Sequence, residues 1–160
     1  MSSINPDIVE LRAFVASGEP TAIGSSPLLE ALGARFVAHE PEARTLTLEF
    51  VPSDLFRQGA GNVQGGAVGA MLDFAMAFAA FTVLGDGHSG VTVALNTQFC
   101  GAAAAGSLTA IGRVDKAGRK MLFASGELRQ GDRLIATAQS DGFGAEWENL
   151  RRGPEFERQW

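Results

Sequence analysis

The chain has 160 residues, 46% of them hydrophobic, and a net charge of −5. That length suits one domain with a sizeable core, and the 13 scattered Lys and Arg residues argue against a nucleic acid or an anionic membrane as the main partner. The single cysteine excludes an internal disulfide and fits a reducing compartment. With two histidines and no Cys/His cluster, we expect no structural metal. The first residues have no basic segment followed by an apolar one, so we expect no signal peptide and a cytoplasmic protein.

A short amphipathic helix is predicted over residues 6–17. Asn5 is a suitable N-cap, and it is followed by proline at the first helical position and by Asp7 in the first turn. Apolar residues then recur at helical spacing. With the loop and the single helical turn that follow, this helix forms an N-terminal segment over residues 1–32.

Residues 33–144 are predicted to form the main domain. Glycine-containing breaks and period-two alternation of apolar and polar residues predict strands at residues 34–39, 43–51, 91–100, 107–115, 119–128 and 132–143. We expect the last four strands to form an antiparallel meander, because two of the breaks between them are short enough for hairpins. The charged tail over residues 145–160 is expected to pack against another surface or to fray.

The segment over residues 64–84 is predicted to be one long helix. It is apolar on every side, so other elements must wrap it, and its only charged residue is Asp73. Because burying an unpaired carboxylate is costly, Asp73 is paired with an arginine or the backbone, neutral, or part of a functional site. A membrane span is excluded, since the run barely reaches the about 20 residues needed, contains Asp73 and has no basic flank.

The predicted order of elements is therefore a helix, two strands, the buried helix and four strands. A curled antiparallel sheet is the natural cover for one apolar helix. We expect an α+β protein, with a curled antiparallel sheet of five to six strands around one long central helix and a short N-terminal helix.

The most specific motif is Gln64–Gly66 followed by Asp73, eight residues after the first glycine. On this motif, residues 43–143 resemble the hotdog-fold acyl-CoA thioesterases, in particular the phenylacetate-degradation and 4-hydroxybenzoyl-CoA thioesterases. The resemblance implies a hotdog fold. Two positions differ from the usual pattern: the motif begins with Gln where the family has His, and Gln58 stands where many members have Asn. The 4-hydroxybenzoyl-CoA branch also has Gln at the position of Gln58, but it has Glu at the position of Asp73. The motif therefore mixes features of different branches of the family.

Thioester hydrolysis needs an oxyanion donor and a base or nucleophile. The backbone N–H groups of Gly65 and Gly66 lie at the start of the long helix, where unpaired donors and the helix dipole favour a developing oxyanion. The alternative is that these glycines only ease close packing. Asp73 would act as general base on water or as nucleophile, and the sequence leaves both roles open.

Further polar residues complete the expected site. Gln58 is expected to orient the carbonyl or the water, or else is a solvated loop residue. Gln64 joins the catalytic set through its place in the motif, and Asn62, in the loop before the helix, is assigned to substrate binding. The resemblance places a Ser or Thr at Thr92, whose hydroxyl would fix the attacking water.

Strand alternation puts Thr92 on one face with Ala94, Asn96 and Gln98. That face is expected to lie opposite the core face, which holds Val91, Val93, Leu95 and Phe99. A simple polar outer face is therefore the alternative to a catalytic role for Thr92.

Geometry bears on how the site is assembled. Eight residues of helix separate Gly65 from Asp73, which is about 12 Å. One thioester carbonyl cannot touch both, so a single site that uses both must lie across a two-fold interface. We expect a homodimer, in a dimer of dimers, and the resemblance likewise implies an acid from the neighbouring subunit.

The coenzyme A phosphates of such a substrate need cations. Arg113, Lys116, Arg119 and Lys120 form the only basic cluster on an acidic chain and are assigned to substrate binding. A solvated hairpin is the alternative. No separate cofactor is expected, because coenzyme A is part of the substrate.

The sequence thus predicts an acyl-CoA thioesterase acting on an aryl or medium-chain acyl group. A hotdog dehydratase or hydratase is the enzyme alternative, but it would want a histidine where Gln64 stands. A non-catalytic acyl-CoA-binding or regulatory domain would follow if an arginine paired with Asp73.

Overall fold

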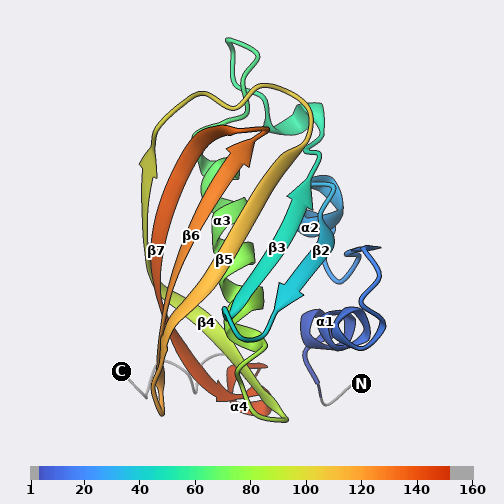
Figure 1. Ribbon diagram of the computed structural model, residues 1–160, viewed down its shortest axis with the longest axis vertical. Coiled ribbons are helices and arrows are strands. Elements are labelled where there is room, and N and C mark those ends of the chain that lie inside the picture. The colour runs from blue at the N-terminus through green and yellow to red at the C-terminus, as the bar shows by residue number, and fades with distance from the viewer. Residues whose placement is uncertain (1–3, 152–160) are drawn as a thin grey trace.

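The structure, a computed structural model, describes residues 4–151 and consists of an antiparallel sheet that curls around a long helix (Figure 1). The helices are α1 (Pro6–Ser17), α2 (Pro27–Ala31), α3 (Gly65–Phe81) and α4 (Trp147–Arg151), with a 3₁₀ turn η1 (Asp54–Phe56). The strands are β1 (Thr21–Ala22), β2 (Arg35–Glu40), β3 (Thr45–Phe50), β4 (His88–Phe99), β5 (Leu108–Ala117), β6 (Met121–Gln130) and β7 (Arg133–Glu146). The predicted α+β class and the single long central helix are confirmed.

The strand order within the described residues is β1-β2-β3-β5-β6-β7-β4, with every pair antiparallel. The two-residue strand β1 adds a seventh strand in a segment expected to be loop. The predicted four-strand meander is wrong in one respect, because β4 lies beside β7 and not beside β5. The reason is that β3 takes the free edge of β5, so β4 can pair only at the far end of the sheet.

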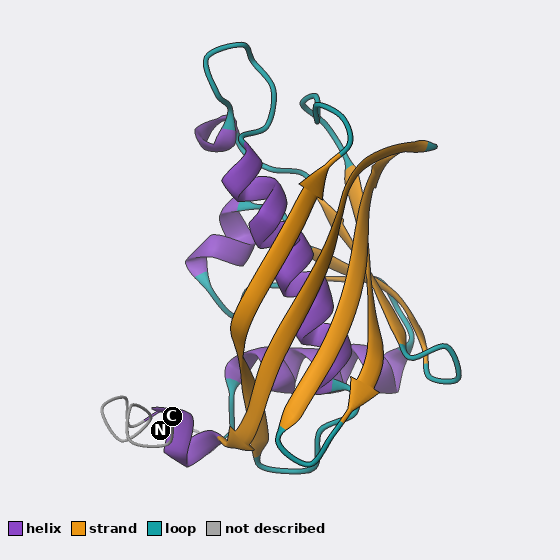
Figure 2. Cartoon of the chain, turned by 90° about the vertical axis from the view of Figure 1, so that its left-hand side faces the viewer, coloured by secondary structure: helices purple, strands orange, loops and turns teal. Residues whose placement is uncertain are grey.

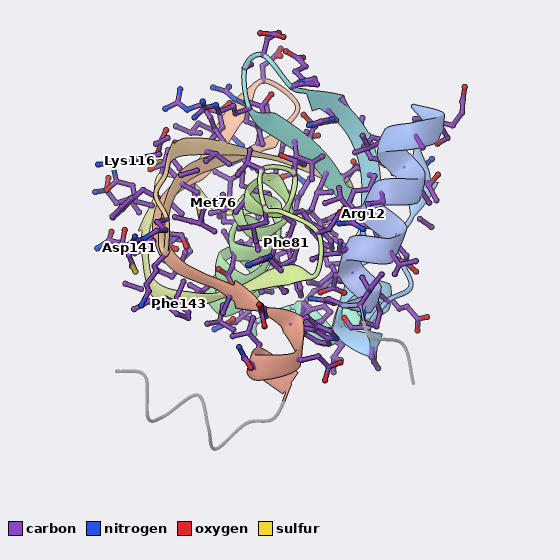
Figure 3. The ribbon with its side chains drawn as sticks, turned by 90° about the horizontal axis from the view of Figure 1, so that it is seen from below. Arg12, Met76, Phe81, Lys116, Asp141 and Phe143 are labelled. Atoms are coloured by element: carbon purple, nitrogen blue, oxygen red, sulfur yellow. The ribbon has the colours of Figure 1, made fainter. Side chains whose placement is uncertain are left out.

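Helix α3 lies against one face of the sheet (Figure 2). Its buried side includes Met71, Leu72, Met76 and Phe78, each at most 1% exposed. Seen from below, the strands curve around the helix, while Lys116, Asp141 and Phe143 lie on the outer side of the sheet (Figure 3). This burial explains why the helix is apolar on nearly every side.

The helix approaches the sheet closely at a pair of glycines. Gly112 on β5 and Gly126 on β6 are direct neighbours in register. A Cβ atom on Gly112 would lie 2.1 Å from the backbone oxygen of Ala75, so only glycine fits there. This contact fixes the distance between α3 and the sheet at Ala75, two residues after Asp73.

The first and last described helices are both tied to residues at the start of β4. Asn5 caps α1 by accepting from the Asp7 N–H, and its side-chain amide donates to the buried hydroxyl of Ser89 at 2.8 Å. In the tail, residues 147–151 form α4, which begins with a hydrogen bond from the Trp147 N–H to the Gly87 oxygen. Residues 152–160 of the predicted tail lie outside the described residues.

None of the helices that the structure describes is long and apolar enough to cross a bilayer.

Candidate active site

Asp73 lies in the middle of α3 on the side that faces the edge strand β4. The Thr92 hydroxyl donates to its Oδ1 atom at 2.7 Å. Burial raises the pKa of Asp73, and the Thr92 hydrogen bond lowers it by a smaller amount. No cation forms an ion pair with Asp73 within residues 4–151. The arginine partner that would favour a purely structural role is absent from this part of the chain.

A β-bulge turns Thr92 toward the helix. Thr92 pairs with Gly142 and Ala94 with Asp141, which leaves Val93 as an extra residue in β4. The extra residue shifts the alternation, so Thr92 shares the helix-facing side with Thr97 and Phe99, which approach Gly69 and Gly65. The expectation that Thr92 lies on the same face as Ala94, Asn96 and Gln98 is therefore wrong.

The N-terminus of α3 is capped by the side chain of Gln64. Its Oε1 atom accepts the N–H groups of Gly66, at 2.5 Å, and of Ala67, at 3.2 Å. The Gly66 N–H expected to bind substrate is thus already bonded in this structure. The Gly65 N–H donates to no acceptor among the described residues and is the donor left for a ligand.

Gly65 lies directly against an aromatic ring. A Cβ atom at this position would be 3.3 Å from Cζ of Phe99, whose side chain lies at the end of β4 and is 58% exposed. A side chain on residue 65 would crowd this ring, so glycine lets Phe99 pack against the first turn of α3. The alternation of residues in the sequence predicts only that Phe99 lies on the core face and gives no signal for this contact.

The loop before α3 gathers the other predicted polar residues at the same end of the helix. The Gln58 N–H donates to the Asn62 oxygen at 2.8 Å, and the Gln58 side-chain oxygen accepts from the Ala60 N–H at 2.6 Å. The Gln64 N–H donates to Phe56. Gln58, Asn62, Gln64 and Gly65 therefore form one cluster, and Asp73 and Thr92 form another, about 12 Å along the helix.

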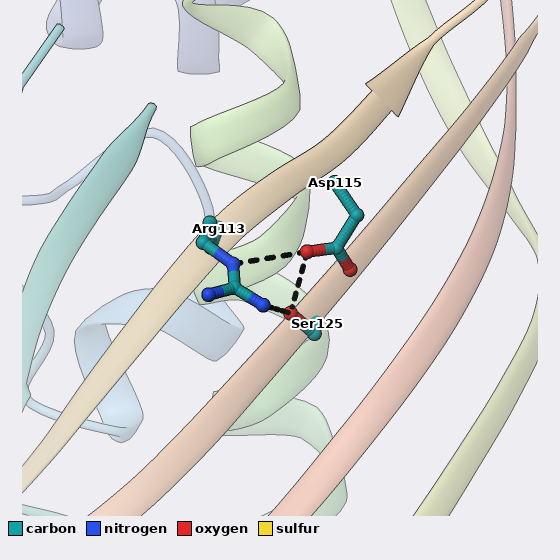
Figure 4. A network of polar contacts seen from close by, with 3 residues as sticks. All are labelled: Arg113, Asp115 and Ser125. Carbon is teal, nitrogen blue, oxygen red and sulfur yellow. Dashed lines mark hydrogen bonds and ion pairs between the residues drawn. The ribbon is translucent and has the colours of Figure 1, made fainter. Parts of the chain in front are cut away.

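The four residues of the predicted basic cluster lie in two different environments in the structure. Arg113 donates to the Asp115 carboxylate at 2.9 Å and to the Ser125 hydroxyl at 3.2 Å, and this hydroxyl donates to Asp115 (Figure 4). The Arg113 guanidinium is therefore already engaged on the outer face. Lys116, Arg119 and Lys120 are exposed around the β5–β6 turn and form no ion pair with a described residue.

Metal ligation finds no support in the described residues, where no three His, Cys, Asp or Glu side chains gather. His39 lies on β2, and the His88 ring at the start of β4 contacts the Asp86 backbone oxygen at 3.1 Å. Cys100 is exposed just after β4. None of the three is bonded to Asp73.

Comparison with known proteins identifies the family of the chain. The model of the thioesterase superfamily matches residues 60–137, and PA0474 of Pseudomonas aeruginosa, an inferred esterase, is 34% identical over 125 residues, which are 78% of this chain and 92% of that protein. The chain therefore belongs to the thioesterase superfamily.

Solved structures agree with this assignment. The crystal structure of an inferred thioesterase from Ralstonia eutropha JMP134, related to phenylacetic acid degradation, shares 36% identity and a TM-score of 0.70 over 75% of this chain and 93% of that one. The Escherichia coli PaaI protein from the phenylacetic acid degradation operon shares only 17% identity, with a TM-score of 0.67 over 88% of this chain and 94% of that one. This second likeness concerns the fold, and the hotdog fold implied by the sequence is confirmed.

Proposed function

We propose that the protein hydrolyses acyl-CoA thioesters with aryl or medium-chain acyl groups to the free acid and coenzyme A, in the cytoplasm. The observation that carries this proposal is the Asp73 carboxyl group, half-buried in an apolar helix, bonded by Thr92 and free of any cation among the described residues. A carboxylate with a raised pKa is a better base than an exposed one. It either takes a proton from the attacking water or attacks the thioester itself.

The second requirement is stabilisation of the oxyanion. The free N–H of Gly65 at the positive end of α3 supplies a donor for it. The Gln64 side chain holds the next two N–H groups, which fixes the first turn of the helix in place. Gln58 and Asn62 lie in the adjoining loop, where their amides are suited to orient the substrate.

Both requirements are met at one carbonyl if two copies of the chain associate through β4. No strand among residues 4–151 pairs with the outer edge of β4, and this strand exposes Val93, Leu95 and Phe99 by 44%, 41% and 58%. An unpaired edge with apolar side chains is a surface that favours strand pairing. Antiparallel pairing of two such edges brings Gly65 of the partner subunit toward Asp73, and each site then combines both chains.

Coenzyme A would extend toward the β5–β6 turn. Ala117 in β5 pairs with Leu122, which pairs with Gly142, the neighbour of Thr92. The turn thus lies at the level of Asp73 on the sheet, three strands away. The free cations of Lys116, Arg119 and Lys120 are suited to the nucleotide phosphates there, whereas the engaged Arg113 is a weaker candidate.

The test is hydrolysis of a panel of acyl-CoA thioesters, followed with a thiol-trapping dye. Asp73→Asn keeps the shape of the side chain and removes the base, so turnover should fall by a factor on the order of 10² to 10⁴. Circular dichroism of the variant controls for folding. A folded variant that retains most of its activity would show that Asp73 is neither base nor nucleophile.

A further inference from the structure

The side-chain amide of Gln64 has one end engaged and one end free. Its Oε1 atom accepts the N–H groups of Gly66 and Ala67 at the start of α3. Because both partners are donors, the atom that faces them must be the oxygen, which settles the orientation of the amide. The Nε2 atom is the opposite end, and it donates to no acceptor among residues 4–151. Gln64 is exposed, so this NH₂ group is open to a ligand.

Gly66 leaves the space that this arrangement needs. A Cβ atom on residue 66 would lie 2.7 Å from Oε1 of Gln64 and 3.6 Å from its Nε2 atom. Such an atom would push the Gln64 amide away from the end of the helix, because a long side chain moves more easily than a helix backbone. The second glycine of the motif is thus explained by the position of the Gln64 side chain.

Gln is an unusual choice for a residue that only caps a helix. The preferred N-cap residues are Ser, Thr, Asp and Asn, whose short side chains reach the first N–H groups directly. A Gln side chain loses more rotamer freedom when it is held in one position. What it adds over Ser, Thr or Asp is a pair of N–H donors, which the cap holds in a fixed place.

The free NH₂ group of Gln64 lies beside the free N–H of Gly65. The Oε1 atom is 2.5 Å from the Gly66 nitrogen, and the dimensions of the amide and of the helix then place Nε2 on the order of 5 Å from the Gly65 nitrogen. Two donors at this separation can bond one oxygen atom at about 3 Å each. The positive end of α3 favours negative charge on that oxygen.

Building on the thioesterase function proposed above, we propose that Nε2 of Gln64 is the second donor of the oxyanion hole, next to the Gly65 N–H. When a new C–O bond forms at the thioester carbon, the π electron pair of the carbonyl moves onto its oxygen, which both donors stabilise. When that pair returns, the C–S bond breaks and coenzyme A leaves as the thiolate, which takes up a proton released from the attacking water. One side chain therefore caps the helix with its oxygen and serves the reaction with its nitrogen.

Gln64→Glu separates the two roles, since the side chains have nearly the same shape. A carboxylate still caps the helix and suits its positive end, so the thermal midpoint should be no lower than that of the wild type. It cannot donate a hydrogen bond, and it repels a developing oxyanion. At pH 8, kcat for the best substrate of the acyl-CoA panel should therefore fall by about 10²- to 10³-fold, while KM changes by less than about 3-fold.

Gln139→Glu is the matched control. Gln139 is exposed and pairs with Ser125 on the outer face of the sheet, so this variant adds the same charge away from α3. Its kcat and KM should equal those of the wild type.

A second comparison does not depend on the Glu variant. Gly66→Ala should displace the Gln64 amide and lower kcat by about 10-fold or more, although alanine is the better helix former. In a Gln64→Ala background the same substitution has no amide to displace, so it should change kcat by less than about 2-fold.

Two results would overturn the inference alone. One is a Gln64→Glu variant that keeps kcat within about 3-fold of the wild type. The other is a loss on Gly66→Ala that is equally large with and without the Gln64 amide. A wild-type protein that hydrolyses no acyl-CoA of the panel would overturn the proposed function, and the inference with it.

Discussion

The carboxyl group of Asp73 is subject to two opposing effects. Burial raises its pKa, and the hydrogen bond from Thr92 lowers it. Burial is the larger effect, so the pKa stays above its ordinary value. If the ionised carboxylate is the reactive form, activity is full above this raised pKa and is lost as the pH falls through it.

Substitution of Thr92 separates the two effects. Thr92→Val removes the hydroxyl, which should raise the pKa of Asp73 further and move the acid limb of the kcat/KM profile to higher pH. The plateau should fall by about 10-fold as the carboxylate loses its orienting bond. Thr92→Ser should restore the wild-type limb. A limb that stays in place would mean that the hydrogen bond has no influence on the ionisation of Asp73.

Asp73 could be predicted from the sequence because a lone charge in an apolar helix is visible without coordinates. The orientation of Thr92 could not, because alternation assumes two residues per repeat and a single bulged residue reverses it. The cap formed by Gln64 was also missed, since a Gln side chain is not among the common capping residues.

At the scale of elements, the packing of α3 on β5 and β6 sets the position of the candidate site. The predicted helix and hairpins follow from periodicity and turn residues, whereas the place of β4 at the sheet edge depends on competition for the edge of β5. Glycine in a strand is usually unfavourable. At Gly112 it is required by the backbone of the helix above it.

Gly112→Ala should therefore destabilise the fold. Its new methyl group would collide with the backbone oxygen of Ala75, and relief requires that α3 move from the sheet, at a cost of at least about 2 kcal/mol. Chemical denaturation measures this. Gly59→Ala is the control, since its added Cβ meets nothing within 4 Å, and its effect should stay within about 0.5 kcal/mol. Equal stability of the two variants would contradict the close contact.

The β5–β6 turn can be tested separately from the catalytic residues. Replacing Arg119 and Lys120 by Ala should raise KM for a full acyl-CoA more than for the matching pantetheine thioester, which lacks the nucleotide phosphates. The expected difference is about 3- to 10-fold, because both side chains are exposed. The same change in KM for both substrates would mean that the side chains of the turn are merely solvated and do not bind the phosphates.

For the whole molecule, a shared site predicts complementation between two inactive chains. Asp73→Ala removes the acid, and Gly65→Pro removes the donor N–H. After the two are unfolded and refolded together, half the dimers should be heterodimers, each with one intact site, so about a quarter of wild-type activity should return. A site within one chain would give no recovery.

The control for this mixture is the oligomeric state of Gly65→Pro. Sedimentation must show that the variant still forms dimers, because a proline at the start of α3 also strains the preceding loop. Heterodimers that form without any recovered activity would show that the two chains do not share a site.

The place of β4 at the sheet edge also affects the order in which the molecule folds. The β5–β6 and β6–β7 pairs are local hairpins, whereas β4 must wait for β7, the last of the described strands, before it can pair. Contacts between distant segments form late because closing long loops costs entropy, and an edge strand is among the first parts to open again. We therefore expect the bond between Asp73 and Thr92 to be among the last to form on folding and the first to break on unfolding. A partner subunit that covers β4 would stabilise this bond. The fraction of chains with a formed site would then rise with protein concentration.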